Sequence, residues 1–429
     1  MKSMISTQKI NTESALFTEE LANSSHEFSE IAKKILNHER VSVDDGYKLI
    51  NTTEIFVLGH MANFVRQRKA YEVAIKRGFS EGTATQRMTQ VWWNTNVHLN
   101  PTNVCIGTCD FCAFAKQPGE EGAYTMSIPE ALDRVVLARD EGATEVHIVG
   151  GLNPKTLIGY YSDLIRAIKK EIPAIHVKAF TAVEIDFFQQ FARSQRDSLN
   201  GSSERAGKMT YEEIFDALIA AGLDSMPGGG AEIFSRQVRD EMCPDKIDAE
   251  TWVKIHQTAH RKGIKTNATM LAGIGEEAEE RVQHMDVLRQ AQDGSLSDAL
   301  AIKKGGSFQT FIPLSCHYEG NDLLERGVKP LTGYDQLRNV AVSRIMLDNF
   351  DNIKAYWIQL GEKMAQLALS FGANDLDGTV KTESITRAAG AKKRCLTENT
   401  LTDLIKGARL EPLERDTIYN PIDLSSHRI

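Results

Sequence analysis

The 429-residue sequence predicts an α/β protein built on a (β/α)8 barrel, with helical extensions at both ends. Two observations predict this fold. Between residues 94 and 385, short β-rich runs alternate about eight times with amphipathic segments, which is the pattern of βα units around a parallel sheet. Residues 1–93 instead carry helical periodicity. We therefore expect a helical layer over 1–93, the barrel over 94–385 and a further extension over 386–429.

The expected barrel elements follow one another in regular order. The strands span residues 97–103, 144–150, 175–181, 223–228, 264–271, 307–314 and 352–357, with a weak eighth at 372–378. The helices begin near Ser127, Thr156, Thr210, Asp248, Glu276, Tyr334 and Gly361. The first start is well marked, because Ser127 and Glu130 stand at the spacing of a capping box. Two polar stretches, 193–208 and 292–306, interrupt the alternation and are interpreted as surface insertions.

Composition and charge restrict the class of protein. With 41% hydrophobic and 25% charged residues, the chain can bury a large core. Its net charge of −8 lacks the basic footprint of a nucleic-acid binder, so no such partner is expected. No stretch approaches the roughly 20 apolar residues that cross a bilayer, and the first residues lack the apolar core of a signal peptide. We therefore expect a cytoplasmic protein with no membrane partner.

Three of the six cysteines form a motif. Cys105, Cys109 and Cys112 stand at C-x3-C-x2-C spacing, directly after the first expected barrel strand. Loops at that end of the strands carry the active sites of (β/α)8 barrels, and thiolates are soft ligands that suit iron–sulfur clusters or zinc. The other cysteines are too few and too scattered for a disulfide framework and are interpreted as packing residues: Cys243, Cys316 and Cys395.

The missing fourth cysteine separates the alternatives for this motif. A closed zinc site or an electron-transfer cluster would usually recruit one nearby, whereas the next cysteine is Cys243. Three cysteines predict a 4Fe–4S cluster with one open iron, which can chelate the amino and carboxylate groups of S-adenosylmethionine (SAM). Electron transfer into the sulfonium would release a 5′-deoxyadenosyl radical. A zinc site that adds His98 to the three cysteines, in a scaffold protein, remains the non-enzyme alternative.

Residues at the ends of other expected strands could contact the cofactor. Gly150 and Gly151 end the second strand, where missing side chains would let the backbone approach the methionine amino group of SAM; an ordinary turn is the alternative. Glu184 follows the third strand and could bind a ribose hydroxyl. Thr269, near the end of the fifth strand, could line the ribose or adenine.

A second set of residues could contact the substrate. His98 and Asn100 stand on the first strand and could face the barrel mouth. The PGGGAE segment, with Gly228, Gly229 and Glu232, closes the fourth βα loop and could cradle substrate or cofactor against its backbone amides. It has no lysine at Walker spacing, which argues against a phosphate loop.

Taken together, the motifs resemble a known family. They are HLNPTNVCIGTCDFCAF, HIVGGLNP, KAFTAVEI, DSMPGGGAEIF and FIPL. The sequence resembles the radical SAM enzymes of the menaquinone pathway, and among them the aminodeoxyfutalosine (aminofutalosine) synthases. The resemblance implies a radical SAM barrel in which Cys105, Cys109 and Cys112 ligate the cluster. Phe111 matches the aromatic of the C-x3-C-x-Φ-C signature, and Gly150 and Gly151 match the loop that binds the methionine part of SAM.

The resemblance also implies a reaction in which SAM is consumed. Its adenosyl radical adds to the vinyl carbon of 3-((1-carboxyvinyl)oxy)benzoate, and the products are 6-amino-6-deoxyfutalosine, methionine and bicarbonate. A flavodoxin or ferredoxin is the implied electron donor. Because this substrate carries two carboxylates, Arg239 and Lys246 are candidate contacts, Arg239 through a bidentate pair. Solvated positions on an amphipathic segment are the alternative for both.

Two neighbouring families share most of these motifs. They are the cyclases of dehypoxanthine futalosine and the deazaflavin-forming (F0-type) synthases. The KAFTAVEI and PGGGAEIF motifs favour the aminodeoxyfutalosine synthases.

Overall fold

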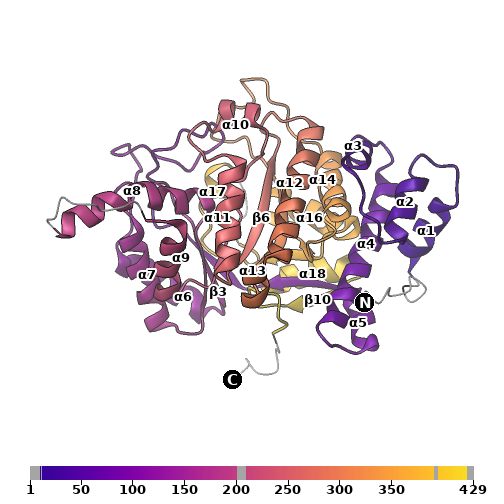
Figure 1. Ribbon diagram of the computed structural model, residues 1–429, viewed down its shortest axis with the longest axis horizontal. Coiled ribbons are helices and arrows are strands. Elements are labelled where there is room, and N and C mark those ends of the chain that lie inside the picture. The colour runs from indigo at the N-terminus through magenta and orange to yellow at the C-terminus, as the bar shows by residue number, and fades with distance from the viewer. Residues whose placement is uncertain (1–9, 11, 201–208, 391–394, 423–429) are drawn as a thin grey trace.

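The computed structural model describes residues 10, 12–200, 209–390 and 395–422, and a curled parallel sheet forms its centre (Figure 1). The sheet has seven strands in sequence order, and every neighbouring pair is parallel. The arrangement confirms the predicted α/β barrel. The strands are β2 (Asn96–Leu99), β3 (Glu145–Ile148), β4 (His176–Ala179), β5 (Ser225–Met226), β6 (Lys265–Ala272), β7 (Phe308–Ser315) and β8 (Asn352–Ile353).

Helices cover the outer face of this sheet. The capping box predicted at Ser127 and Glu130 is confirmed, and Thr210 and Thr332 form further capping boxes. No helix among the described residues is long and apolar enough to cross a membrane. The helices of the barrel region are α6 (Ile128–Asp140), α7 (Ile158–Glu171), α8 (Ala182–Asn200), α9 (Tyr211–Ala221), α10 (Arg236–Met242), α11 (Ala249–Arg261), α12 (Ala278–Ser297), α13 (Ala299–Lys304), α14 (Gly333–Met346), α15 (Trp357–Leu360), α16 (Glu362–Ala368) and α17 (Ile385–Ala388). Of these, α10, α15 and α17 lie at the C-terminal ends of the strands, next to the site.

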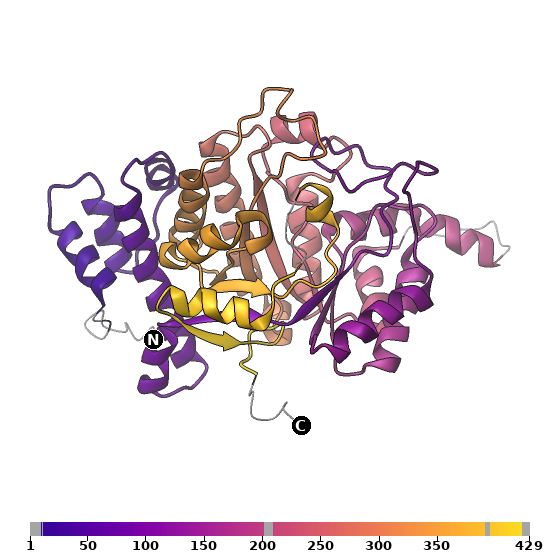
Figure 2. The ribbon, with the colours of Figure 1, turned by 180° about the vertical axis from the view of Figure 1, so that it is seen from behind.

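The predicted eighth strand is present as β9 (Asp375–Gly378), but it belongs to a second sheet. Single bridges join this segment to the barrel on both sides, Lys354 to Asp375 and Val97 to Lys381. β9 also pairs with β1 (Gln90–Asn94), which pairs with β10 (Glu411–Glu414) in a three-stranded parallel sheet. Figure 2 shows the yellow strand β10 and helix α18 (Glu398–Gly407) beside this three-stranded sheet. The sequence did not predict β1 or β10.

The N-terminal helices pack against the outside of the barrel, where α3 (Val43–Ile50) contacts α12 and α14, and α4 (Ile55–Lys76) contacts α14 (Figure 1). Gly46 permits one close approach, because a Cβ at this position would stand 2.7 Å from Cγ1 of Val282. β1 joins this layer to the C-terminal segment through β9 and β10, so the division at residues 93 and 385 stays a prediction. The helices are α1 (Glu13–Ala22), α2 (Ser29–Leu36), α3 (Val43–Ile50), α4 (Ile55–Lys76) and α5 (Glu81–Arg87).

The interpretation of residues 292–306 as a surface insertion is wrong. These residues complete α12 and form α13. Gln292 is buried and exchanges two hydrogen bonds with the backbone of Phe308, at 2.9 and 3.0 Å. Its polar side chain therefore holds the start of β7. Of the other polar stretch, residues 193–200 continue α8, and 201–208 lie outside the described residues.

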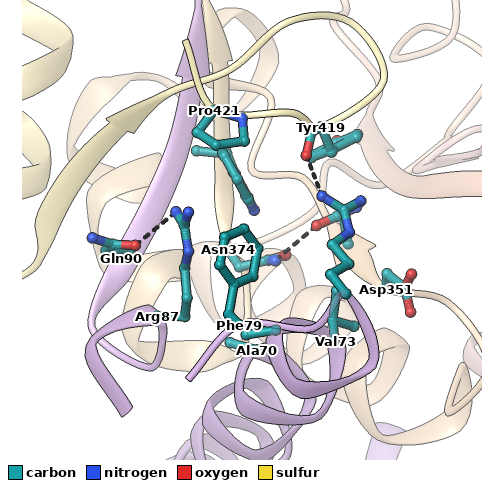
Figure 3. A pocket seen from close by; sticks show the side chains of 13 residues that line it. Ala70, Val73, Phe79, Arg87, Gln90, Asp351, Asn374, Tyr419 and Pro421 are labelled. Carbon is teal, nitrogen blue, oxygen red and sulfur yellow. Dashed lines mark hydrogen bonds between the residues drawn. The ribbon is translucent and has the colours of Figure 1, made fainter. Parts of the chain in front are cut away.

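A small cavity of about 50 Å³ lies at the N-terminal ends of the strands, between α4, α5 and the C-terminal segment (Figure 3). Arg87 donates a hydrogen bond to Oε1 of Gln90 at 2.8 Å, and its guanidinium stands 5.4 Å from the ring centroids of both Phe79 and Trp92. Arg77 donates to the carbonyl of Tyr419 at 2.6 Å. These contacts join the N-terminal helices to the end of the chain, at the face of a barrel that usually serves stability.

Candidate cluster and substrate site

The three motif cysteines lie together at the C-terminal ends of the barrel strands. Cys105, Cys109 and Cys112 stand on the loop after β2 and line one cavity of about 280 Å³, which we call the outer chamber. The predicted cofactor-binding residues Phe111, Gly150, Gly151 and Glu184 line it as well, as do Gly229, Glu232 and Lys246. Thr269 does not; it lines a second cavity.

The cysteine loop is held by hydrogen bonds from several elements. The Cys105 amide donates to the carbonyl of Lys116 at 2.9 Å, and the Ile106 amide donates to the carbonyl of Leu152 at 3.1 Å. The segment after α10 holds the middle of the loop. Asp245 accepts from the amide and hydroxyl of Thr108, at 3.0 and 2.5 Å, and the carbonyl of Met242 accepts from the Asp110 amide at 3.0 Å. No motif spacing links residues 242–245 to the cysteine loop, so the sequence did not predict that they support it.

The chemistry of the donor set fits an iron–sulfur cluster better than zinc. Among the described residues, no three His, Cys, Asp or Glu side chains are placed to hold a single metal ion. A cluster makes no such demand, since each thiolate binds a different iron. His98, the proposed fourth zinc ligand, lines the second cavity and not the outer chamber. The zinc alternative therefore has no geometric support.

Of the two glycines of the β3 loop, Gly151 is required by close approach to the cysteine loop, and Gly150 is packed less tightly. A Cβ at Gly151 would stand 2.2 Å from the carbonyl oxygen of Val104 and 3.1 Å from Cβ of Cys105. The Gly151 amide donates to the carbonyl of Thr102 at 2.9 Å. At Gly150 the nearest atom, the Thr102 carbonyl oxygen, would be 3.2 Å away. The loop next to the cysteines can pack this tightly only without side chains.

Glu184 ties this loop to the next strand. Its carboxylate accepts from the Gly150 amide at 3.0 Å and from the amide and hydroxyl of Thr181, both at 2.8 Å. Burial raises the pKa of Glu184 to about 7, although these hydrogen bonds favour the charged form. The carboxyl group is therefore close to its midpoint at neutral pH, at the edge of the outer chamber.

A second cavity, the inner chamber, lies deeper in the barrel and measures about 210 Å³. Gly229, Thr181, Leu314 and Gln359 line both chambers, so the two adjoin. The inner chamber collects most of the predicted substrate contacts, namely His98, Asn100, Gly228 and Gly229, together with Thr269. It also has lining residues that were not predicted: Glu145, His147, Lys178, Lys354 and Asp377.

Several of these residues have local partners. Asn100 donates to the carbonyl of Val149 at 2.9 Å and accepts from the Ser384 amide at 3.1 Å. The Thr269 hydroxyl donates to the carbonyl of Gly228 at 2.6 Å and so holds the glycine-rich loop. Both side chains thus shape the chamber wall.

His98, His147 and Lys178 occupy matching register positions on β2, β3 and β4. The two imidazole centroids are 4.5 Å apart, and the Lys178 ammonium is 2.9 Å from the Glu145 carboxylate. Burial lowers the pKa of His147 well below its usual value, so the ring is neutral, and its Nε2 has no hydrogen-bond partner among the described residues. Polar residues at alternate positions of the strands were the missed signal, since alternate side chains face the barrel interior.

Lys246 and Glu232 form an ion pair inside the outer chamber. The Lys246 ammonium lies 5.1 Å from the ring centroid of Phe111. Burial opposes the ammonium charge, yet the neighbouring Cys109, Glu232 and Cys243 raise the pKa of Lys246 above its usual range. Both residues were predicted to contact the substrate, and both line the outer chamber, but in the structure each is the ion-pair partner of the other.

The predicted contact between Arg239 and a substrate carboxylate is not supported. Arg239 is 5% exposed and lines neither chamber. Its guanidinium donates to the carbonyls of Ala231 at 2.6 Å and Ile233 at 3.1 Å, and also to the carbonyl of Ile247. An amphipathic pattern cannot distinguish a guanidinium that binds backbone from one that binds substrate. Arg239 holds the glycine-rich loop against α10.

We therefore expect Arg239→Ala to reduce stability while the KM values stay unchanged. The substitution removes the Arg239 donor from the buried carbonyls of Ala231 and Ile233 and from the partly buried carbonyl of Ile247, and a buried carbonyl that loses its donor costs on the order of 1–3 kcal/mol. Thermal unfolding of the variant measures the loss. Arg236→Ala is the matched control, because Arg236 lies on the same helix with 93% of its side chain exposed. A raised substrate KM at unchanged melting temperature would contradict this role.

Comparison with known proteins agrees with the geometry. The radical SAM superfamily matches residues 99–288, and the CofH/MqnC C-terminal region matches residues 305–428. The hydrogenase maturase HydG from Carboxydothermus hydrogenoformans has the same fold, with a TM-score of 0.64 at 17% identity over 96% of this chain and 86% of that chain. The protein is thus a radical SAM enzyme, and such enzymes use a 4Fe–4S cluster and SAM.

Sequence relatives narrow the family further. Aminodeoxyfutalosine synthase from Thermus thermophilus is 40% identical over 395 residues, covering 91% of this chain and 95% of that protein. The enzyme of the same name from Streptomyces coelicolor is 37% identical over 401 residues, covering 91% and 92%. The chain belongs to the aminodeoxyfutalosine synthase family. A 5-amino-6-(D-ribitylamino)uracil–L-tyrosine 4-hydroxyphenyl transferase from Methanococcoides burtonii is 36% identical over 338 residues, covering 77% of this chain and 87% of that protein.

Proposed function

We propose that the protein joins the 5′-deoxyadenosyl group of SAM to 3-((1-carboxyvinyl)oxy)benzoate. With one water consumed, the products would be 6-amino-6-deoxyfutalosine, methionine and bicarbonate, on the futalosine route to menaquinone. The observation that carries this proposal is the length of the match, since both aminodeoxyfutalosine synthases cover 91% of the chain. A flavodoxin or ferredoxin as electron donor and a cytoplasmic location belong to the same proposal.

The two adjoining chambers support a reaction between two bound molecules. When bound to the three cysteines, the cluster supplies the electron that cleaves SAM. The outer chamber, with Cys105, Gly150 and Glu184 in its wall, is the place for SAM. The inner chamber, with His98, His147 and Lys178, offers hydrogen-bond donors for the second substrate. Gly229 and Thr181 line both chambers, so the two ligands would lie next to each other. Because the inner chamber is buried deeper in the barrel than the outer one, a substrate bound there would meet the radical away from water.

A second candidate function is 4-hydroxyphenyl transfer in deazaflavin formation. The relative from Methanococcoides burtonii favours it, at 36% identity over 338 residues. It covers less of this chain than the aminodeoxyfutalosine synthases do, 77% against 91%. We therefore place it second.

The test is a set of anaerobic reactions with the reconstituted protein. It is supplied with SAM, dithionite and one of three substrates: 3-((1-carboxyvinyl)oxy)benzoate, dehypoxanthine futalosine, or tyrosine with 5-amino-6-(D-ribitylamino)uracil. A product that contains the adenosine of SAM supports the proposal. Free 5′-deoxyadenosine accompanied by a cyclised or hydroxyphenyl product would instead support one of the neighbouring families.

His147→Phe should weaken substrate binding without affecting the cluster. The imidazole Nε2 is buried and unpartnered among the described residues, so a substrate carboxylate can satisfy it. Loss of such a hydrogen bond costs on the order of 1–2 kcal/mol, and we expect KM for the benzoate to rise about tenfold. Iron content and cleavage of SAM without substrate should stay at the wild-type level. An unchanged KM would exclude His147 from the substrate site.

A further inference from the structure

Lys246 is the only lysine or arginine among the described residues that line the outer chamber. Its side chain is 17% exposed and pairs with Glu232, whose side chain is 10% exposed. The pair shares the chamber with all three cysteines. A cluster held there gains one negative charge when it is reduced, so a nearby fixed charge acts on its two oxidation states unequally.

Two residues of the cysteine loop, Phe111 and Thr108, contact Lys246 or the residue before it. Its ammonium stands 5.1 Å from the ring centroid of Phe111, which lies in sequence between Cys109 and Cys112. The preceding residue, Asp245, accepts two hydrogen bonds from Thr108 of the same loop. The Asp245 carboxylate thus ties the residue before Lys246 to the cysteine loop, and the ion pair with Glu232 holds the ammonium.

Glu232 is held in a conformation that its residue type seldom adopts. Its backbone φ is +45°, in the left-handed region that usually favours glycine. The Glu232 carbonyl accepts from the Leu271 amide at 2.7 Å, which fixes the loop against β6. Three glycines precede Glu232 in the PGGGAE segment, yet this position carries a carboxylate that meets Lys246. An unusual backbone conformation kept at a site points to a role for the side chain.

We propose that the Lys246–Glu232 pair sets the reduction potential of the cluster. The ammonium stabilises the reduced cluster and raises the potential, whereas the carboxylate opposes this effect and lowers it. The step concerned is the one-electron reduction of the cluster by a low-potential donor, and no covalent bond changes. The proposal depends on the cluster and not on the identity of the second substrate.

The experiment is a potentiometric titration of the reconstituted full-length protein with dithionite, followed by electron paramagnetic resonance and without SAM or substrate. Lys246→Met should lower the midpoint potential, and Glu232→Gln, which keeps the shape of the side chain, should raise it. Lys246→Arg should stay near the wild-type value. A purely structural role would change iron content or melting temperature but would not move the two potentials in opposite directions.

A second buried ion pair provides the matched control. Lys178 and Glu145 are 2.9 Å apart and line the inner chamber but not the outer one. Lys178→Met and Glu145→Gln should shift the potential less than the corresponding changes in the Lys246–Glu232 pair. The proposal would be overturned if the potential stayed unchanged in both Lys246→Met and Glu232→Gln. It would also be overturned if the two variants shifted the potential in the same direction. If Lys246→Met fails to hold iron, Glu232→Gln decides, because an unchanged potential there overturns it alone.

Discussion

Replacing any one of Cys105, Cys109 and Cys112 by alanine is expected to abolish both cluster assembly and product formation. Each thiolate binds a different iron, and the other two cannot replace it. The barrel should remain folded, because all three side chains are partly exposed on a loop whose hydrogen bonds come from its backbone and from Thr108. Replacement of such a side chain costs less than about 1 kcal/mol. Iron and sulfide content, optical spectra and product formation measure the effect, and circular dichroism measures the fold.

The other cysteines give the matched control for this prediction. Cys395 is exposed and lines neither chamber, so Cys395→Ala should keep iron, sulfide and activity. Cys243 is buried and Cys316 lines the outer chamber, yet neither belongs to the motif, and both alanine variants should still assemble the cluster. Full turnover by an iron-free Cys109→Ala protein would contradict the radical mechanism itself.

Gly151→Ala is expected to have the second-largest effect. The added Cβ would stand 2.2 Å from the Val104 carbonyl oxygen, and no side-chain rotation relieves a contact between two backbones. The cysteine loop must shift, at a cost of about 1–3 kcal/mol, and the thiol of Cys105 shifts with it. We expect iron content to fall severalfold. Measurement of iron per chain and of SAM affinity in the residual holoenzyme gives the result.

The neighbouring glycine provides the comparison. A Cβ at Gly150 would stand 3.2 Å from the Thr102 carbonyl oxygen, so Gly150→Ala needs shifts of only a few tenths of an ångström. Its iron content should stay closer to that of the wild type. Normal iron content in Gly151→Ala, with SAM affinity alone reduced, would show that this glycine acts by contact with the cofactor and not by supporting the loop.

The features that depend on local sequence patterns could be predicted from the sequence alone. Strand and helix alternation predicted the barrel, and the Ser127–Glu130 spacing predicted the start of α6. The cysteine spacing predicted which loop carries the thiols. β10 could not be found in this way, because its sequence is Glu-Pro-Leu-Glu, and both proline and glutamate are rare in strands. Its conformation depends on pairing with β1, where Gln90 meets Glu411.

The site residues were harder to predict, since their roles depend on partners from distant segments. Arg239 has the charge expected of a carboxylate ligand, but its guanidinium binds carbonyls of the glycine-rich loop that precedes α10. Lys246 lies in the chamber as a cation, yet its partner Glu232 is known only once the loop is folded. For His147 the alternation of polar residues along the strand was a signal, but only the register of the neighbouring strands places His98 and Lys178 beside it.

Because β9 closes the barrel, the cysteine loop is synthesised before the barrel can close. The cysteine loop precedes β9 by most of the barrel sequence, so the three thiols leave the ribosome long before Asp375 can bridge Lys354. At about 5–20 residues per second, this interval lasts on the order of tens of seconds. Pairings between such distant segments also form slowly. The nascent enzyme therefore passes through a stage in which the cluster loop exists and the barrel is still open beside β2.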